Sequence, residues 1–470
     1  MPTKKLSSYQ ESSVNSSGRT SVFRCALMLL GMLPACLTDA QNTAATPASA
    51  NQQVTSIGDA LKRSVTEPVH ILYIHGIGAT EAYDSSELRV SICKVLKDCI
   101  VMGGEAVGRE YADQGVFEPS HAAPDVTYMG QPIWMNQEEW RAAAPFVDHY
   151  VIRLKRGKNI LLDELNWWPM MFSLKCRNML PNEISLAGHD DGYLSLCSQR
   201  KEHQSDGVTG RFDTYAWITP DQAAKWSALD NKGVVLNRKL KVNLMDWRFS
   251  DALLGVGPLE KYLVEGTRQL LMKCVSTAAA TTAHLNTTTP TQQAADAEYI
   301  SISHSLGSFL IFSALHLEYT PPTGSLDGSD PKREEVFDYL LGHLSQAYFF
   351  ANQIPLLELA KLGSAQDADA FLDLKNWADQ RRKFMKNTPS NGTEPLVQIV
   401  AWSDPNDLLT WYLGEDFERW QANGNGVHVV NRLVKNAPHW FWAVEGPTSA
   451  HDNYAKNSEV IRELLKPLQP

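Results

Sequence analysis

The chain has 470 residues, of which 43% are hydrophobic and 20% are charged, a composition typical of globular proteins. Its 53 acidic and 43 basic residues give a formal net charge of −10. An acidic protein argues against nucleic-acid binding, which needs basic patches, so we expect no nucleic-acid partner. The length is sufficient for one large domain or for two to three small ones.

The N-terminal part of the chain is expected to direct export of the protein and to tether it to a membrane. Residues 1–23 are polar and serine-rich, and Arg24 precedes the uncharged apolar segment 25–33, which is too short to cross a bilayer as a stable helix. A basic flank, a short apolar segment and small residues are typical of a secretory signal. Residues 1–35 are therefore interpreted as a signal segment and the protein as exported.

Residues 33–36, Leu-Pro-Ala-Cys, resemble a bacterial lipobox, in which the cysteine becomes the lipidated N-terminus. Pro34 departs from the usual choice at its position, and cleavage after Ala40 is the alternative. Lipidation of Cys36 would hold the protein on a membrane, as a periplasmic or outer-membrane lipoprotein if the source is bacterial. Residues 36–67 lack a hydrophobic period and are rich in Thr, Ala, Asn, Gln and Ser, which indicates a flexible linker.

The seven cysteines contain no Cys-x-x-Cys motif and do not cluster with histidines at metal-ligand spacing, so no metal site is predicted from them. Cys93 and Cys99 are expected in one helix, on different faces. Cys176 and Cys197, in a loop-rich segment, are the candidate disulfide pair.

The folded domain is expected to span residues 68–470 and to begin with a strand. Residues 69–74, VHILYI, form a continuous apolar run, which predicts a buried strand of the parallel type. The sequence His-Gly-Ile-Gly follows at residues 75–78. A capping-box variant that starts at Asp84, followed by apolar residues at helical spacing, predicts a helix that reaches Cys99.

The middle of the chain has weaker signals. The predicted elements are, in order, a loop insertion at 101–148 with one short helix near 137–144, a strand pair at 150–156 and 159–167, a strand at 240–247, a helix through 262–273 and a flexible connection at 276–297. Irregular residues 169–237 are the candidate cap insertion, and the His189-Asp190-Asp191 sequence within them is interpreted as a solvated loop rather than a metal site.

Residues 298–317 hold the strongest motif of the chain. The segment begins with β-branched and aromatic residues that predict a short strand, and it turns sharply at residues 303–307. The residues that follow are apolar on nearly every side, which predicts a buried helix. A strand, a tight turn and a buried helix with a serine at the apex, here Ser305, are the arrangement of a nucleophile elbow. The residues two before and two after the apex must be small where strand and helix pass each other, and Ser303 and Gly307 satisfy this.

The C-terminal part continues to alternate strands with helices. The predicted elements are a loop at 320–330, a strand at 346–353, a helix at 367–385, a core strand at 396–402, strands at 427–430 and 440–444, and a helix from Asn453 onward. Such alternation predicts an α/β fold with a mostly parallel sheet covered by helices on both faces. In these sheets the sites lie at the carboxyl ends of the strands.

The Ser-His-Ser-Leu-Gly motif at 303–307, together with His-Gly-Ile-Gly at 75–78, resembles the α/β-hydrolase superfamily, in its lipase/esterase part, which includes GPI-deacylase-like proteins. Ser303 stands where the usual elbow has glycine. The resemblance covers residues 68–465 and implies an α/β-hydrolase fold with a cap-like insertion. It also implies hydrolysis of a carboxylic ester through an acyl-serine intermediate, with a small-molecule or lipid ester as substrate and with no metal or organic cofactor.

In this family the nucleophile, the acid and the base follow in the order Ser, Asp or Glu, His. The resemblance therefore implies Ser305 as nucleophile and His451 as base, with Asp407 as the acid and Asp404 as the alternative. The backbone N–H groups of Ile77 and Leu306 are the implied oxyanion donors. His316 is expected inside the buried helix that follows Ser305, and the histidines at 428 and 439, in or beside apolar strands, are expected to be core or surface residues. His75 is expected to be a structural hydrogen-bonding residue.

The Asp-Pro-Asn-Asp sequence is typical of a type I turn, in which Asp404 can accept a hydrogen bond from the turn's own backbone. Asp407 leaves the turn and is expected to orient His451, although it could instead cap a helix that starts at Leu408. Two other functions stay open. A thioesterase or a peptidase would use the same three residues, and a binding protein could retain the fold without catalysis.

Overall fold

The computed structural model describes residues 56–63, 68–77, 85–112, 127–128, 131–132, 144–171, 249–257, 260–285, 298–316, 331–361, 370–385, 397–413, 426–436, 439–440, 444–445 and 447–466. Several predictions fall outside this part of the chain: the signal segment 1–35 with Cys36, the Asp84 N-cap, the helix near 137–144 apart from its last residue, the cap insertion after Met171 with Cys176 and Cys197, and the strand at 240–247.

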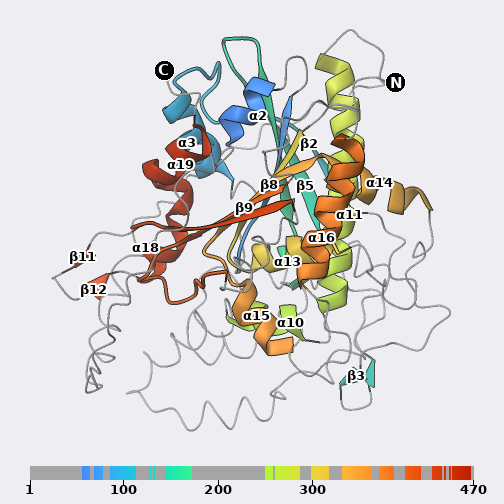
Figure 1. The fold of residues 1–470 in the computed structure, drawn as a ribbon, viewed down its shortest axis with the longest axis vertical. Coiled ribbons are helices and arrows are strands. Elements are labelled where there is room, and N and C mark those ends of the chain that lie inside the picture. Colours follow the sequence, from blue (N-terminus) through green and yellow to red (C-terminus); the bar gives the residue numbers. More distant parts are fainter. Residues whose placement is uncertain are drawn as a thin grey trace, which may run out of the picture.

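An eight-stranded sheet with the order β10-β9-β8-β7-β1-β6-β5-β2 forms the centre of the molecule (Figure 1). Its strands are β1 (Val69–Ile74), β2 (Glu105–Tyr111), β5 (Phe146–Arg153), β6 (Asn159–Asn166), β7 (Glu298–His304), β8 (Leu344–Phe350), β9 (Val397–Ser403) and β10 (Val427–Leu433). Neighbours from β10 to β6 pair in parallel, whereas β5 pairs antiparallel with β6 and with β2. The expected mostly parallel α/β sheet is therefore present.

Two short strand pairs lie outside this sheet. They are β3 (Thr127–Tyr128) with β4 (Gln131–Pro132), and β11 (His439–Trp440) with β12 (Val444–Glu445). The last pair, which is antiparallel, occupies the place of the single strand expected at 440–444.

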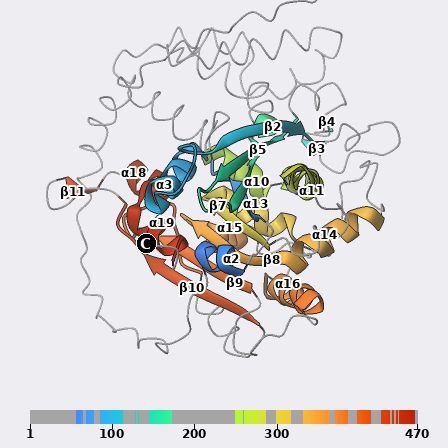
Figure 2. The ribbon, with the colours of Figure 1, turned by 90° about the horizontal axis from the view of Figure 1, so that it is seen from above.

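Both faces of the sheet are buried, which explains why the central strand β1 reads as an apolar run with no alternation of polar and apolar residues. Along β1, Ile71 and Tyr73 pack into one hydrophobic cluster, while Leu72 and Ile74 pack into the other. The first cluster is covered by α2 (Ile57–Arg63), α3 (Ser86–Leu96), the 3₁₀ helix η8 (Tyr454–Lys456) and α19 (Ser458–Leu464). The second is covered by α10 (Ser250–Val256), α11 (Glu260–Leu285), α13 (Leu306–Ala314), α14 (Pro331–His343), α15 (Ile354–Lys361) and α16 (Ala370–Met385). Figure 2 shows α3 and α19 on one side of the strands and α11, α14 and α16 on the other.

None of the helices among the described residues combines the length and the apolar character that a bilayer crossing requires.

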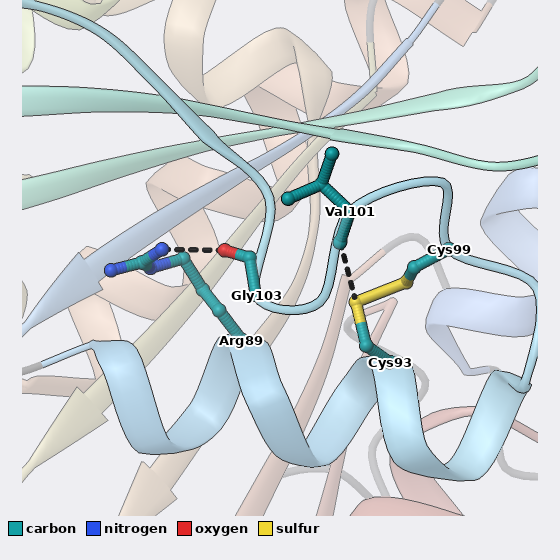
Figure 3. The surroundings of a disulfide bond; sticks show 5 residues. All are labelled: Arg89, Cys93, Cys99, Val101 and Gly103. Atoms are coloured by element: carbon teal, nitrogen blue, oxygen red, sulfur yellow. Dashed lines mark hydrogen bonds between the residues drawn. A yellow bond between two sulfur atoms is a disulfide. The ribbon is translucent and has the colours of Figure 1, made fainter.

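The pairing of Cys93 with Cys99 corrects the prediction that both lie in one helix (Figure 3). A continuous helix would separate residues six apart by about 9 Å along its axis. Instead α3 ends at Leu96, and Lys97 takes the left-handed conformation while its N–H donates to the carbonyl of Cys93. The chain turns back, which brings the two cysteine Cα atoms to 5.4 Å and allows the disulfide.

The loop insertion expected at 101–148 contains strand β2, which is a second correction. Among the described strands it lies at the edge of the sheet and pairs with β5 alone, and nearly all of its residues are exposed. An exposed edge strand need not carry an apolar alternation, so no sequence pattern indicated it.

Two segments expected to be flexible are partly helical. Helix α11 continues to Leu285, through the alanine-rich residues 278–280 of the predicted connection, because alanine is the strongest helix former. In the predicted linker, Ile57, Ala60 and Leu61 form a buried stripe of α2. Gly58 permits close packing there, since a Cβ atom at this position would lie 2.4 Å from the carbonyl oxygen of Leu465.

Candidate active site

The carboxyl ends of the parallel strands β1, β7 and β9 meet at one edge of the sheet, and each leads directly into a predicted site segment. Strand β1 leads into the His75-Gly76-Ile77 turn, and β7 leads into Ser305 at the start of α13. Strand β9 leads into the Asp404–Asp407 turn. His451 reaches this edge from a later segment, the short helix α18 (Pro447–Asp452), whereas the sequence predicts a helix only from Asn453 onward.

Ser305 occupies a strained backbone conformation at the sharp turn between strand and helix. Its φ of 55° and ψ of −127° lie outside the regions that non-glycine residues ordinarily adopt. Such a conformation costs of the order of 1–3 kcal/mol and persists only where the surroundings enforce it. Here the N–H of Ser305 donates to the carbonyl of Phe350 at 2.8 Å, and its carbonyl accepts from the N–H of Ser308 at 3.0 Å.

Small residues allow the strand and the helix to pass closely on either side of this turn. A Cβ atom on Gly307 would lie 2.4 Å from the carbonyl oxygen of His75. A Cβ atom on Gly76 would lie 2.7 Å from the Cβ of Ser305. Ser303 fits where glycine is usual because its buried hydroxyl finds partners, with Oγ 3.0 Å from Oγ of Ser308.

His451 and Asp407 form a buried pair. The imidazole Nδ1 lies 2.9 Å from both carboxylate oxygens, and both residues are 5% exposed. A carboxylate only accepts hydrogen bonds, so Nδ1 carries a proton, and in the neutral imidazole Nε2 is then the nitrogen with the lone pair. The pair is therefore held in the tautomer that can accept a proton at Nε2.

The two atoms that would exchange a proton, Oγ of Ser305 and Nε2 of His451, are both buried and have no hydrogen-bond partner among the described residues. The segments that carry them are in contact, since the ring centroids of His304 and His451 are 4.9 Å apart. Hydrogen bonds between a nucleophile and its base are often looser before substrate binds than during reaction. An unpaired hydroxyl and an unpaired acceptor on touching segments can thus act as nucleophile and base.

Asp404 has a different set of partners from Asp407. Its Oδ1 accepts from the N–H of Asn406 at 2.9 Å, and its Oδ2 accepts from the N–H of Asn436 at 2.6 Å. The carboxylate thus holds its own turn and fixes the segment after β10. Asp407 also stabilises local backbone by accepting from the N–H of Leu409 at 2.9 Å, but no helix begins at residue 408.

His75 is a structural residue. Its ring is buried and stacks on Trp167, with ring centroids 5.2 Å apart. Burial lowers the pKa of His75 to about 4, so the ring is neutral near pH 7. The indole N–H of Trp167 donates to the His75 carbonyl at 3.1 Å, which fixes the turn that leads to Ile77.

The histidines that compete with His451 for the role of base are His316, His428 and His439. His316 follows the end of α13 instead of lying inside it, and its carbonyl accepts from Arg268. His428 lies in β10, where burial and the charge of Arg432 lower its pKa. His439 lies in β11, and its side chain is outside the described part of the structure.

Three side chains near the elbow offer atoms that a cation could use. One ligand atom each from His304, His451 and Asp452 lie within 4.8 Å of one another. However, Nε2 of His304 already bonds the carbonyl of His451, and Nδ1 of His451 already bonds Asp407. A cation would have to replace at least one of these hydrogen bonds or use the remaining ring nitrogens.

Sequence reasoning missed Tyr454, whose hydroxyl joins the two aspartates. It accepts from the N–H of Asp404 at 2.7 Å and donates to Oδ2 of Asp407 at 3.4 Å. Burial raises the pKa of Tyr454 well above its ordinary value, so the hydroxyl keeps its proton and remains a donor. A contact between segments about fifty residues apart leaves no local pattern, so the sequence could not have revealed it.

The loop that follows Asp407 presents apolar side chains to solvent. Leu408 is 75% exposed, and Trp411 and Tyr412 are about half exposed. Two hydrogen bonds with Asn352 hold this loop, from Trp411 N–H to its carbonyl at 2.8 Å and from its side-chain amide to the Trp411 carbonyl at 3.0 Å. These three exposed side chains, which follow Asp407 in the chain, are called the apolar rim below.

Comparisons with protein-family models, with curated proteins and with solved structures find no match for this chain.

Proposed function

We propose that this chain is a serine hydrolase of the α/β-hydrolase type that cleaves carboxylic esters through an acyl-serine intermediate. The observation that carries the proposal is the strained Ser305, whose buried hydroxyl has no partner in the part of the chain that the structure describes, beside the buried His451–Asp407 pair. Strain and unsatisfied polar groups each cost stability, and their coincidence at the carboxyl edge of a parallel sheet is typical of a catalytic site.

The proposed reaction starts with proton transfer from Oγ of Ser305 to Nε2 of His451 while Oγ attacks the ester carbonyl carbon. Asp407 holds the proton on Nδ1 and stabilises the imidazolium that forms. His451 then gives the proton to the departing alcohol, which leaves an acyl-serine. Water, deprotonated by His451, hydrolyses this intermediate and restores Ser305.

Two backbone N–H groups would stabilise the negative charge on the carbonyl oxygen. Leu306 is the first residue of α13, where an amide has no acceptor within the helix. Ile77 follows the tightly packed Gly76 at the end of β1. The partial positive charge of the α13 N-terminus favours an anion at the same point.

The apolar rim favours an ester with an apolar acyl group. Leu408, Trp411 and Tyr412 provide a surface that such a group would cover next to Asp407. The proposal includes a cap formed by residues 169–237. It also includes export by the signal segment and membrane association through a lipidated Cys36.

Hydrolysis of p-nitrophenyl esters of increasing acyl length tests the proposal. Ser305→Ala should lower kcat by at least about 10⁴-fold, because the three residues act as a unit. Ser313→Ala, a half-buried serine of the same helix α13, is the matched control and should keep wild-type turnover. Matching thioester and anilide substrates separate the esterase from a thioesterase or a peptidase. Equal turnover by Ser305→Ala and wild type would contradict the mechanism.

A further inference from the structure

His304, the last residue of β7 and the neighbour of Ser305, bonds the segment that carries the base. Its Nε2 lies 2.7 Å from the carbonyl oxygen of His451. A carbonyl oxygen only accepts, so Nε2 of His304 carries the proton and donates it. The residue before the nucleophile thus holds the main chain of the residue proposed as the base.

The ring of His304 is also fixed on its other sides. It packs against the rings of His451 and Tyr454, with centroid distances of 4.9 Å and 6.2 Å. Gly76 lies against its Nδ1 edge, where a Cβ atom would approach to 2.9 Å. Contacts from three segments leave the imidazole little freedom to move, so its hydrogen bond is held in one direction.

The segment that receives this bond has little stability of its own. Helix α18 contains only six residues, too few to form an isolated helix in water. Its main chain is held elsewhere by the side chain of Asn436, which donates to the carbonyl of Ala450 at 3.0 Å. The ring of His451 is held by Asp407, but that bond does not fix the position of the backbone.

We propose that His304 is a positioning residue that sets the His451 backbone, and hence Nε2, relative to Oγ of Ser305. The proposal rests on the function proposed above for Ser305 and His451. Because β7 carries His304 and leads directly into Ser305, the hydrogen bond ties the base to the same rigid strand as the nucleophile. Asp407 then sets the orientation of the His451 ring, whereas His304 sets its distance from Ser305.

Two substitutions separate the hydrogen bond from the volume of the ring. His304→Phe keeps a ring but removes the donor, and His304→Gln places an amide N–H near the position of Nε2. We expect kcat for a p-nitrophenyl ester to fall by about 10- to 100-fold in His304→Phe with KM unchanged, since small displacements of catalytic groups have effects of this size. His304→Gln should recover most of the loss. His428→Phe, a half-buried histidine in β10, is the control and should keep wild-type kcat.

Circular dichroism gives the folded fraction of each variant, and the labelling rate with a fluorophosphonate gives a second measure of Ser305 reactivity. A structural role alone would lower the melting temperature and leave kcat per folded molecule unchanged. Wild-type kcat in His304→Phe, or equal losses in His304→Phe and His304→Gln, would overturn the proposal and leave the proposed function intact. A Ser305→Ala variant as active as wild type would overturn both.

Discussion

Ser305 at the elbow and Lys97 at the end of α3 are both non-glycine residues with positive φ, at 55° and 52°, yet their surroundings differ. Lys97 has a ψ of 19° and lies in the left-handed helical region, where many helices end. Its N–H donates to the carbonyl of Cys93, so the conformation completes an ordinary helix cap. Ser305 has a ψ of −127° and completes no cap with its side chain.

The two residues with positive φ differ in the contacts that hold their conformations. At the end of α3 the left-handed residue turns the chain toward Cys99, and the disulfide and the Arg89–Gly103 hydrogen bond secure the turn (Figure 3). At the elbow, close packing surrounds a rarer conformation, and Oγ of Ser305 finds no hydrogen-bond partner within the described ranges. We therefore expect changes at the elbow to alter activity and changes at the end of α3 to alter stability alone.

A loss of kcat as large as that expected for Ser305→Ala should follow substitution of the acid, Asp407. This substitution alters the catalytic chemistry and leaves the backbone of the elbow unchanged. Asp407→Asn should lower kcat by about 10⁴-fold, because an amide can no longer fix the proton on Nδ1 of His451. Asp404→Asn is the matched variant and should lower the melting temperature more than kcat, since its partners are backbone N–H groups. A large loss of kcat confined to Asp404→Asn would transfer the role of the acid to Asp404.

The second prediction concerns the close packing at Gly307, which holds Ser305 in its strained conformation. Gly307→Ala would place a Cβ atom 2.4 Å from the carbonyl oxygen of His75, and backbone atoms cannot move aside easily. We expect a loss of about 3 kcal/mol in unfolding free energy, measured by urea denaturation. Gly108→Ala on the exposed strand β2 meets no atom within 4 Å and should change stability little. Equal stability of the two variants would mean that the elbow does not depend on this close approach.

The third effect concerns the disulfide. Replacing Cys93 and Cys99 together by serine should cost about 2 kcal/mol in unfolding free energy, the value expected for closure of a short loop. Esterase kcat should stay at the wild-type level, because this loop does not lie at the carboxyl edge of the sheet. Loss of kcat at full folding would show that the end of α3 contributes to the site and would remove the contrast with the elbow.

The smallest effects are expected when glycine replaces Lys97 or Ser305, because glycine adopts a positive φ without steric strain. Lys97→Gly should raise the unfolding free energy by about 0.5–1 kcal/mol with no change in kcat. Ser305→Gly should raise it by about 1–2 kcal/mol relative to Ser305→Ala, which keeps the strained Cβ, while both serine variants lose activity. Thermal unfolding of wild type and these three variants provides the comparison. A smaller gain at position 305 than at position 97 would mean that the elbow stores no more strain than a helix cap.

The strands buried on both faces could be predicted from the sequence, because β1 and β9 are mostly apolar and β7 carries β-branched and aromatic residues. The sharp turn at Ser305 could also be predicted, since the elbow requires small residues at fixed positions. The edge strand β2 could not, because its side chains face solvent. The helix α2 was hidden in a polar composition, although three apolar residues at helical spacing were present.

The site could be predicted only in part. Asp407 and His451, which the order of the motif places together, do lie in contact, while their catalytic roles stay predictions. The contacts of His304 and Tyr454 could not be predicted, because they depend on how closely α18 and η8 approach the elbow. The disulfide was missed for a similar reason, since it depends on where α3 ends.

The role of Ser305 as nucleophile is tested most sharply by mapping the residue that a fluorophosphonate labels in the folded protein, by digestion and mass spectrometry. We predict one label for each molecule, on Ser305, that is absent from Ser305→Ala and forms far more slowly in His451→Ala. Labelling of folded Ser305→Ala at the wild-type rate, or no labelling of the folded wild type, would contradict this role.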